Sequence, residues 1–472
     1  MHAKTWQDYE REGGDVAGFV LAAIRAHKAS GAYKTALEAD LYDRQMNVTV
    51  NGYARILYSL STEVDAQGLE RARVTSKDDF TASRSHLASN FFHRLNTQRV
   101  QYSLGAGVSF TNDAEGTAKA TMGEGFDHNM AEAAFYACIH GESFVFWNLD
   151  RTHVFKLTEF APLYDERTGR LRGGIRFWRL AKDKPMEAVF YTEDGYTEWR
   201  EDGKGELSPI NADGTKADAA AVRPYVTVTS YLPADDSTTV IGERGYGSLP
   251  IVPVWAGRLK QSSLIGMRGQ IDAYDLVKSG FANDLQDCAQ VYWIIKNAGG
   301  MTDADYSRFR DRLLLEHIAG VDGVDGSEAV PYTQEIPYQA RQALLKELRD
   351  GIYEDFGALD VHTVAAGAMN DHIDAAYQPM DEEASDFEYW VGEAIRQLMR
   401  LAGAEGEPVF TRQRVSNQKE QVEMVATEAQ WLDTRTILQM LPNIRPEQVT
   451  AIMEAMDGED SARLCSSGDE GE

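Results

Sequence analysis

Apolar residues return every three or four positions along several stretches of the chain, which is the spacing of a helix that buries one face. Residues 1–60 are expected to be largely helical, and the further helices cover residues 80–100, 123–139, 264–289, 338–357 and 379–403. Pro337 and Pro379 stand where two of these helices would begin, a position that suits proline. Between these two helices, residues 358–377 show no usable periodicity and are expected to form a loop.

The pattern changes at Ser143 to short alternating runs of aromatic, β-branched and polar residues, which favour strands. The expected strands cover residues 144–147, 155–157, 174–178, 189–191, 196–199, 250–255, 291–295 and 409–415. Glu193-Asp194-Gly195 would be a tight turn, and the glycine-rich stretch 242–247 a surface turn before the Pro250 strand. Helices before and after a region of strands indicate an α+β fold.

The composition is that of a large globular protein. With 472 residues, of which 43% are hydrophobic, the chain is long enough for two to four domains. No apolar run approaches the roughly 20 residues that span a bilayer, and the first residues lack the apolar core of a signal peptide. Cys138, Cys288 and Cys465 are far apart and lack metal-ligand spacing, which disfavours a disulfide framework and fits a cytosolic compartment.

The net charge of −27 allows two interpretations. Proteins that bind nucleic acid tightly usually carry a basic surface, because neutralised phosphates release counterions. The chain is therefore either a protein that never meets DNA or one that must let DNA slide past without gripping it. Charge alone does not separate the two.

Familiar catalytic signatures are missing from the sequence. It contains no GxxxxGK[ST], HExxH, GxSxG or CxxC motif, so we predict no catalytic residue, no metal site and no cofactor. Asp322, Asp325 and Glu328 lack the ligand pattern of an EF-hand and are interpreted as a hairpin turn. His362 and His372 are interpreted as loop histidines. One enzymatic alternative stays open, an acidic multidomain hydrolase acting through paired carboxylates in the 140–200 region.

Four stretches of sequence follow one another in an informative order. In the first, Asn90-Phe91-Phe92 leads through a helix into the turn Tyr102-Ser103-Leu104-Gly105, and in the second, residues Ala137 to Phe144 pass from a helix into a strand. The third contains aromatic strands between Pro162 and Trp199. In the fourth, Ile271-Asp272-Ala273-Tyr274-Asp275 precedes Asn283-Asp284-Leu285. In this order the chain resembles the phage portal protein family, the head-to-tail connectors of long-tailed phages. The resemblance covers roughly residues 80–405.

The resemblance implies a portal fold, with a mixed α/β wing, a stem of long helices, a small α/β clip and a helical crown. The implied segments are 1–262 (wing), 263–289 (stem helix), 290–337 (clip), 338–357 (stem helix), 358–377 (tunnel loop), 378–415 (long helix and wing strand) and 416–472 (crown and acidic tail). Phe281 and Leu285 of the first stem helix are expected to be buried between helices, where truncation of either to alanine costs about 2–5 kcal/mol.

The implied function is structural. The protein would be the subunit of a ring, twelve-fold in the virion, that lines a channel for packaging and ejection of double-stranded DNA. It would not be an enzyme, and its partners would be further copies of itself, the terminase large subunit, capsid and scaffolding proteins and a head-tail adaptor, with no membrane. It would act at the portal vertex of the capsid, after assembly in the host cytoplasm. Another structural subunit of the virion is the remaining alternative.

The resemblance also places a mobile loop in the DNA channel. The residues expected to face DNA there are His362, Thr363, Val364, Met369, Asn370 and His372. Gly367 and the small residues around it suit the close passage of a duplex. An inert surface connection between two helices is the alternative interpretation of this segment.

Overall fold

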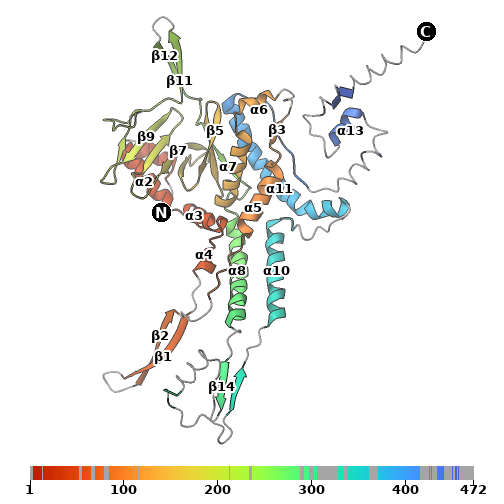
Figure 1. Ribbon diagram of the computed structural model, residues 1–472. Helices are drawn as coiled ribbons and strands as arrows, with labels where there is room; N and C mark the ends of the chain where they lie inside the picture. Colours follow the sequence, from red (N-terminus) through yellow and green to blue (C-terminus); the bar gives the residue numbers. More distant parts are fainter. Residues whose placement is uncertain are drawn as a thin grey trace, which may run out of the picture. The chain divides into compact units, whose positions relative to one another are not determined.

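The structure is a computed structural model. It describes residues 4–12, 14–52, 56–64, 70–78, 84–111, 113, 116–211, 213–232, 237–287, 292–296, 302, 304–305, 328–332, 337–360, 370–414, 425, 427, 433–440, 449, 452–453 and 455–456. The chain divides into two compact units, each built from segments that are distant in the sequence (Figure 1). Unit 1 comprises Met1–Leu37, Leu95–Ser263 and Asp355–Glu472, and unit 2 comprises Glu38–Arg94 and Leu264–Glu354.

A five-stranded antiparallel sheet in the order β10-β9-β8-β7-β6 forms one part of unit 1. Its strands are β6 (Phe160–Tyr164), β7 (Leu171–Trp178), β8 (Glu187–Tyr191), β9 (Tyr196–Glu201) and β10 (Leu207–Pro209). Helices α1 (Trp6–Glu12) and α2 (Val16–Ala29) pack on this sheet. Phe19 and Ile24 of α2 are buried with Ile175 and Phe190 of the sheet, so the alternating runs bury their apolar side under the helix.

A three-stranded sheet in the order β13-β4-β5 forms the second part of unit 1. Its strands are β4 (Ser143–Asn148), β5 (Arg151–Lys156) and β13 (Ile251–Val254). Helices α7 (Phe126–His140) and α11 (Asn370–Ala402) share a core with it, in which Met130, Val145 and Ile395 are fully buried. The remaining elements of unit 1 are α6 (Thr117–Thr121), α13 (Thr434–Met440), the strand pair β3 (Val108–Phe110) and β16 (Pro408–Phe410), and the hairpin of β11 (Val226–Leu232) and β12 (Ser237–Arg244).

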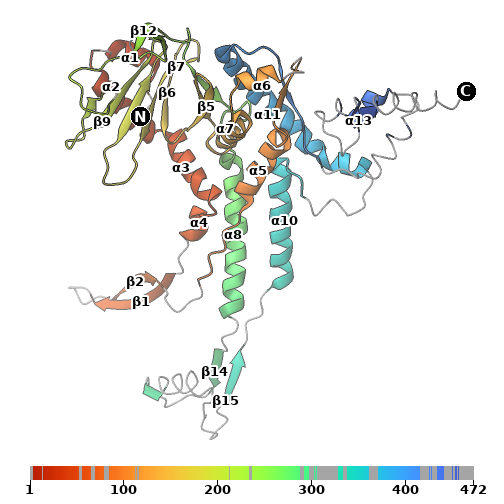
Figure 2. The same ribbon diagram turned by 45° about the horizontal axis from the view of Figure 1, so that its top comes forward.

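Two long helices dominate unit 2. Helices α8 (Leu264–Asp287) and α10 (Tyr338–Phe356) run side by side (Figures 1 and 2), with the rings of Phe281 and Tyr338 5.6 Å apart and Arg341 2.5 Å from Asp284. The other elements of this unit are α4 (Val48–Asn51) and the hairpins β1–β2 (Ile56–Val64, Glu70–Asp78) and β14–β15 (Tyr292–Lys296, Glu328–Tyr332). Helices α3 (Gly31–Asp43) and α5 (Phe91–Leu104) run from one unit into the other.

The predicted α+β class is confirmed, as are the long helices at α8 and α10 and the strands β4, β7, β8 and β9. Strand β5 begins earlier than expected, at Arg151, and ends at Lys156, and β6 was expected only from the family resemblance. None of the helices in the described part of the chain is long and apolar enough to cross a membrane. The division into units changes between Ser263 and Leu264, one residue from the predicted boundary at 262, and it also places Glu38–Arg94 with α8 and α10.

The predicted start of the last long helix is wrong. Helix α11 begins at Asn370, not near Pro379, and it carries Pro379 inside it. Tyr377, Met380 and Ala384 are all buried, at spacings of three and four, so the apolar face continues on the N-terminal side of the proline. Proline lacks an N–H and removes one helical hydrogen bond, and burial of this face offsets that loss.

Four smaller expectations are also corrected. Residues 84–90 are not helical, because α5 begins only at Phe91, and β1 lies partly within the region expected to be helical. Residues 242–244 belong to strand β12, which leaves Gly245 to Gly247 as the turn. Leu285 is 52% exposed and therefore not buried between helices within the chain. Asp322 and Asp325 lie outside the described residues, while Glu328 begins β15.

Candidate functional site

The residues expected to face DNA divide into two groups. His362, Thr363, Val364 and Met369 lie outside the described residues. Asn370 and His372 fall in the first turn of α11, so they belong to a helix and not to the predicted loop. The structure describes the residues on either side of 361–369 in the chain.

The residues before this segment, Phe356 to Leu359, are bound to helix α5. Arg99 lies over the ring of Phe356, with 4.5 Å between the guanidinium carbon and the ring centroid, and donates a hydrogen bond to the carbonyl of Phe356 at 3.4 Å. Gln98 donates to the carbonyl of Leu359 at 3.1 Å. Between these carbonyls, Gly357 has φ +64°, a left-handed conformation that favours glycine, and an added Cβ would come within 2.8 Å of Glu383. Helix α10 therefore ends in a turn that is fixed against α5.

Helix α11, which follows the segment, is bound to α5 as well. The rings of Tyr377 and Tyr102 stack 5.7 Å apart, and both residues are buried in one cluster with Leu359 and Met380. Arg99 pairs with Glu383 of α11 at 2.9 Å. The space left inside this junction is about 10 Å³, room for about one water molecule and not for a ligand. Both ends of the 361–369 segment are thus anchored on α5.

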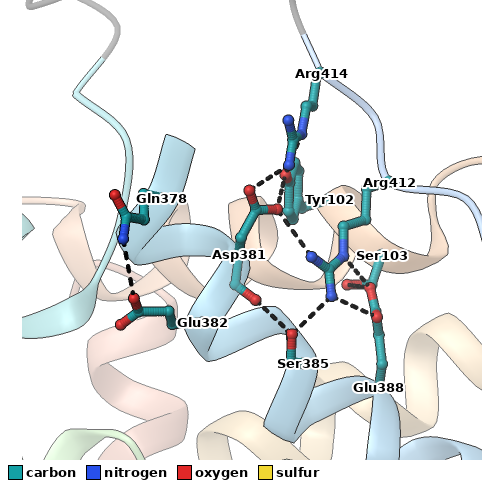
Figure 3. A network of polar contacts seen from close by, with 9 residues as sticks. All are labelled: Tyr102, Ser103, Gln378, Asp381, Glu382, Ser385, Glu388, Arg412 and Arg414. Atoms are coloured by element: carbon teal, nitrogen blue, oxygen red, sulfur yellow. Dashed lines mark hydrogen bonds and ion pairs between the residues drawn. The ribbon is translucent and has the colours of Figure 1, made fainter. Parts of the chain in front are cut away.

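A network of charged residues continues from this junction along α11 (Figure 3). Asp381 accepts hydrogen bonds from the hydroxyl of Tyr102 at 2.6 Å, from Arg412 at 2.9 Å and from Arg414. Arg412 also grips Glu388 with two hydrogen bonds of 2.9 Å each, the forked geometry that makes such pairs strong. The network ties the residues that follow β16 to helices α5 and α11.

The pKa shifts in this network indicate a structural role and not a catalytic one. Hydrogen bonds to Glu388 raise the pKa of the Arg412 guanidinium. Burial acts to raise the pKa of Asp381, but the hydrogen bonds from Tyr102 and Arg414 outweigh it and hold that pKa below its usual value. A carboxylate with a lowered pKa stays ionised near neutral pH and is a poor proton carrier there. The network therefore acts as a clamp.

Unit 2 contains a second organised polar array, on helix α8. Asp275, Ser279 and Asn283 stand four residues apart on one helix face. Their side chains accept hydrogen bonds from the backbone N–H groups of Ser89, Leu87 and Ser85, in that order, at 2.8, 2.9 and 2.6 Å. All three helix residues are buried. Burial raises the pKa of Asp275, whose carboxylate also accepts a hydrogen bond from Asn47. We call this array the α8 ladder, and it binds the extended segment 84–90 along the helix.

The strongest candidate for the hydrolase alternative is Glu142. This side chain is half-buried, and its carboxylate accepts hydrogen bonds from Nε1 of Trp255 at 2.9 Å and from the hydroxyl of Tyr164. Burial raises its pKa to about 8. Its partners are aromatic donors, with the ammonium of Lys260 3.5 Å above the Trp255 ring, and not a second carboxylate in an open cleft. Among the described residues, no group of three or more His, Cys, Asp and Glu is placed to hold a metal ion.

The sequence-based reasoning missed most of these residues. Arg412 and Arg414 were expected only as part of a strand-like run, and Tyr102, a partner of Arg414, is 312 positions away in the chain. One signal was available for the clamp, because Asp381, Ser385 and Glu388 lie on one face of an amphipathic helix. Asp275 and Asn283 belong to the fourth stretch that carried the family resemblance.

Comparisons with known proteins agree with that resemblance. A sequence model of the family described as "Phage portal protein, SPP1 Gp6-like" matches residues 40–462. The portal protein of Clostridium phage phiCD119 is 26% identical over 206 residues, which cover 42% of this chain and 46% of that protein. The portal protein of Bacillus phage SPP1 is 25% identical over 195 residues, which cover 38% of each. The chain therefore matches less than half the length of these curated relatives.

Proposed function

Because this chain belongs to the SPP1 Gp6-like family of phage portal proteins, we propose that its copies assemble into a closed ring, a dodecamer in the virion, whose channel passes double-stranded DNA. Portal proteins are structural components of the phage capsid, in a family that is not enzymatic. DNA would enter through the channel during packaging and leave through it during ejection.

The ring proposal rests on the apolar side chains that α8 and α10 expose to solvent. Ile265 and Leu285 of α8 are 56% and 52% exposed, and Tyr338 and Leu344 of α10 are 55% and 42% exposed. A helix of 24 residues such as α8 is about 36 Å long, so these side chains are spread along an extended surface. Contact with neighbouring copies would remove them from water, and a head-to-tail interface that closes on itself yields a ring.

The acidity of the chain supports passage of DNA without retention. Each contact between a cation and a phosphate adds affinity, so a channel that gripped the duplex at many phosphates would slow its movement. A net charge of −27 per copy favours repulsion from the backbone. The DNA-facing contacts would come from the tunnel segment, with His362, Thr363, Val364 and Met369 between the two ends anchored on α5. Asn370 and His372 would face the channel from the start of α11.

Other parts of the chain would bind the packaging partners. The sequence contains no phosphate-binding loop, so the work of packaging would come from a separate ATPase, the terminase large subunit. That motor and later a head-tail adaptor would dock on the clip, residues 290–337. The wing would contact capsid and scaffolding proteins during assembly in the host cell, and residues 416–472 would form the crown.

A test of the ring proposal measures the mass of the purified chain by light scattering over a concentration series, together with negative-stain images. We expect a mass near twelve subunits and particles with a central hole. Leu285→Asp should lower the assembled fraction, because a charge would enter the interface, whereas Gln286→Asp at the neighbouring exposed position should assemble like the unmodified chain. A monomer at every concentration and salt would contradict the proposal.

A further inference from the structure

Unit 1 contains a groove of about 740 Å³ that has no role in the proposed function as described above. Four parts of the chain form it: the turn between β6 and β7, the β8–β9 turn at Glu193, the stretch from Tyr246 through β13 to Trp255, and the face of α11 that carries Gln397 and Leu401. The apolar part of the lining comes mainly from β13, with Leu249 before it and Leu401 of α11, and polar and charged side chains supply the rest. This composition suits an apolar side chain flanked by polar or charged groups.

The groove is electrically balanced although the whole chain is strongly acidic. Its charged lining consists of three acids and three arginines, Asp165, Glu193, Glu393, Arg170, Arg172 and Arg400. Arg172 pairs with Glu193 at 3.1 Å and Arg400 with Glu393 at 3.7 Å. Two copies with 27 negative charges each repel one another at most approaches. A neutral groove is a place where a second copy can come close.

A complementary projection lies at the turn between β7 and β8, residues 179–186. Leu180 in this turn is 87% exposed, the largest fraction among the large apolar residues that the structure describes. Three cations stand beside it, of which Arg179 pairs with Glu201 at 2.5 Å and Lys184 lies 3.8 Å from Asp183, so that with Lys182 the turn keeps a net charge of one positive. The turn thus presents one apolar side chain in a weakly cationic setting, which an acidic second copy attracts.

The topology prevents the groove and this turn from meeting within one chain. The turn that lines the groove precedes β7, and the turn that carries Leu180 follows it. Strand β7 has eight residues, so its two ends lie about 26 Å apart. A head-to-tail contact needs two different patches on each copy, and these two turns supply such a pair.

We infer that the β7–β8 turn of one copy inserts Leu180 into the groove of the next copy, between α11 and the β6–β7 turn. The inference rests on the proposed ring and names one contact that would close it. Insertion would cover Leu180, the most exposed of the large apolar side chains described in unit 1, and would bring the cations of the turn toward Glu393 and Asp165.

The test is a cysteine pair, Leu180→Cys with Gln397→Cys, in a chain where Cys288 and Cys465 are serine. A disulfide requires Cα atoms within about 7 Å, so this pair can form only between copies. Oxidation should produce a ladder of covalent multimers on a non-reducing gel. Each single cysteine should give no species beyond a dimer, and the pair Val222→Cys with Gln397→Cys, whose valine is 60% exposed, should give no ladder.

A second measurement does not depend on cross-linking. Leu180→Asp should raise the concentration needed for half-assembly by about tenfold or more, the effect of losing a buried leucine, while Val222→Asp should leave it unchanged. If rings form and the cysteine pair gives no more than the singles, this contact is wrong and the ring proposal stands. If the unmodified chain never assembles, both fall.

Discussion

At the scale of single residues, Glu142 couples the stability of unit 1 to pH. Its carboxyl lies between Trp255 and Tyr164, and burial raises its pKa from an ordinary 4.5 to about 8. Between these two values the folded chain holds a proton that the unfolded chain has lost. The stabilising contribution is therefore complete below pH 4.5, decreases as the pH rises, and is lost above about pH 8.

Glu142→Gln should remove this pH dependence, because glutamine can accept the same hydrogen bonds and does not titrate. We expect its unfolding temperature to fall less between pH 5 and 8 than that of the unmodified chain, as followed by circular dichroism. Glu405→Gln, at an exposed acid, should keep the original slope. Parallel curves for the unmodified chain and Glu142→Gln would show that the carboxyl is already ionised in the folded state.

At the scale of elements, the α8 ladder joins a helix to an extended segment through side chains. The backbone N–H groups of alternate residues in 84–90 need acceptors because the segment pairs with none of the strands that the structure describes. A step of two extended residues is about 6.6 Å and a step of four helical residues about 6 Å, so the two repeats nearly match. This match explains why polar residues at Asp275, Ser279 and Asn283 can all find partners.

Ser279→Ala should weaken unit 2 by leaving the N–H of Leu87 without its acceptor. Ser279 is 1% exposed, and a buried group left without a hydrogen bond costs about 1–3 kcal/mol. Urea unfolding of the variant should show a lower midpoint with an unchanged slope. Gln286→Ala, on the exposed side of the same helix, is the matched control and should shift stability by less than about 0.5 kcal/mol. Equal midpoints for the two variants would remove the ladder from the stability of this unit.

At the scale of the whole molecule, residues 361–369, which we propose to be the tunnel loop, lie in the chain between two anchored stretches. Tyr102, Leu359 and Tyr377 hold the two ends in one buried cluster, and Arg99 contacts both helices that flank it. Substitutions between the anchors should therefore leave these contacts intact. The proposed role of the loop in DNA passage can then be tested without disturbing assembly.

Replacing Ala366, Gly367 and Ala368 by phenylalanine should give normal rings that package DNA more slowly, because bulky side chains would narrow the proposed channel. Ring mass and packaging in an in vitro assay with the terminase motor would be measured separately. Serine at the same three positions is the matched control and should package normally. Packaging at the unmodified rate by the phenylalanine variant would exclude the loop from the mechanism.

Local periodicity was enough to predict α8, α10 and the strands β4, β7, β8 and β9, because each follows from which neighbouring positions are apolar. The order of short motifs was enough to indicate the family. The same periodicity could not tell that Leu285 faces outward, since a pattern identifies an apolar face and not what covers it.

Tertiary contacts decided the rest. Helix α11 extends back to Asn370 across Pro379 because Tyr377 and Met380 are buried against Tyr102, a contact between residues about 280 positions apart. Segment 84–90 is extended because α8 supplies acceptors for its backbone. The clamp on Asp381 depends on arginines that only the folded chain brings to α11. Sequence alone determined which faces of the elements are apolar, and the fold determined their partners, because contacts between distant residues depend on the whole packing.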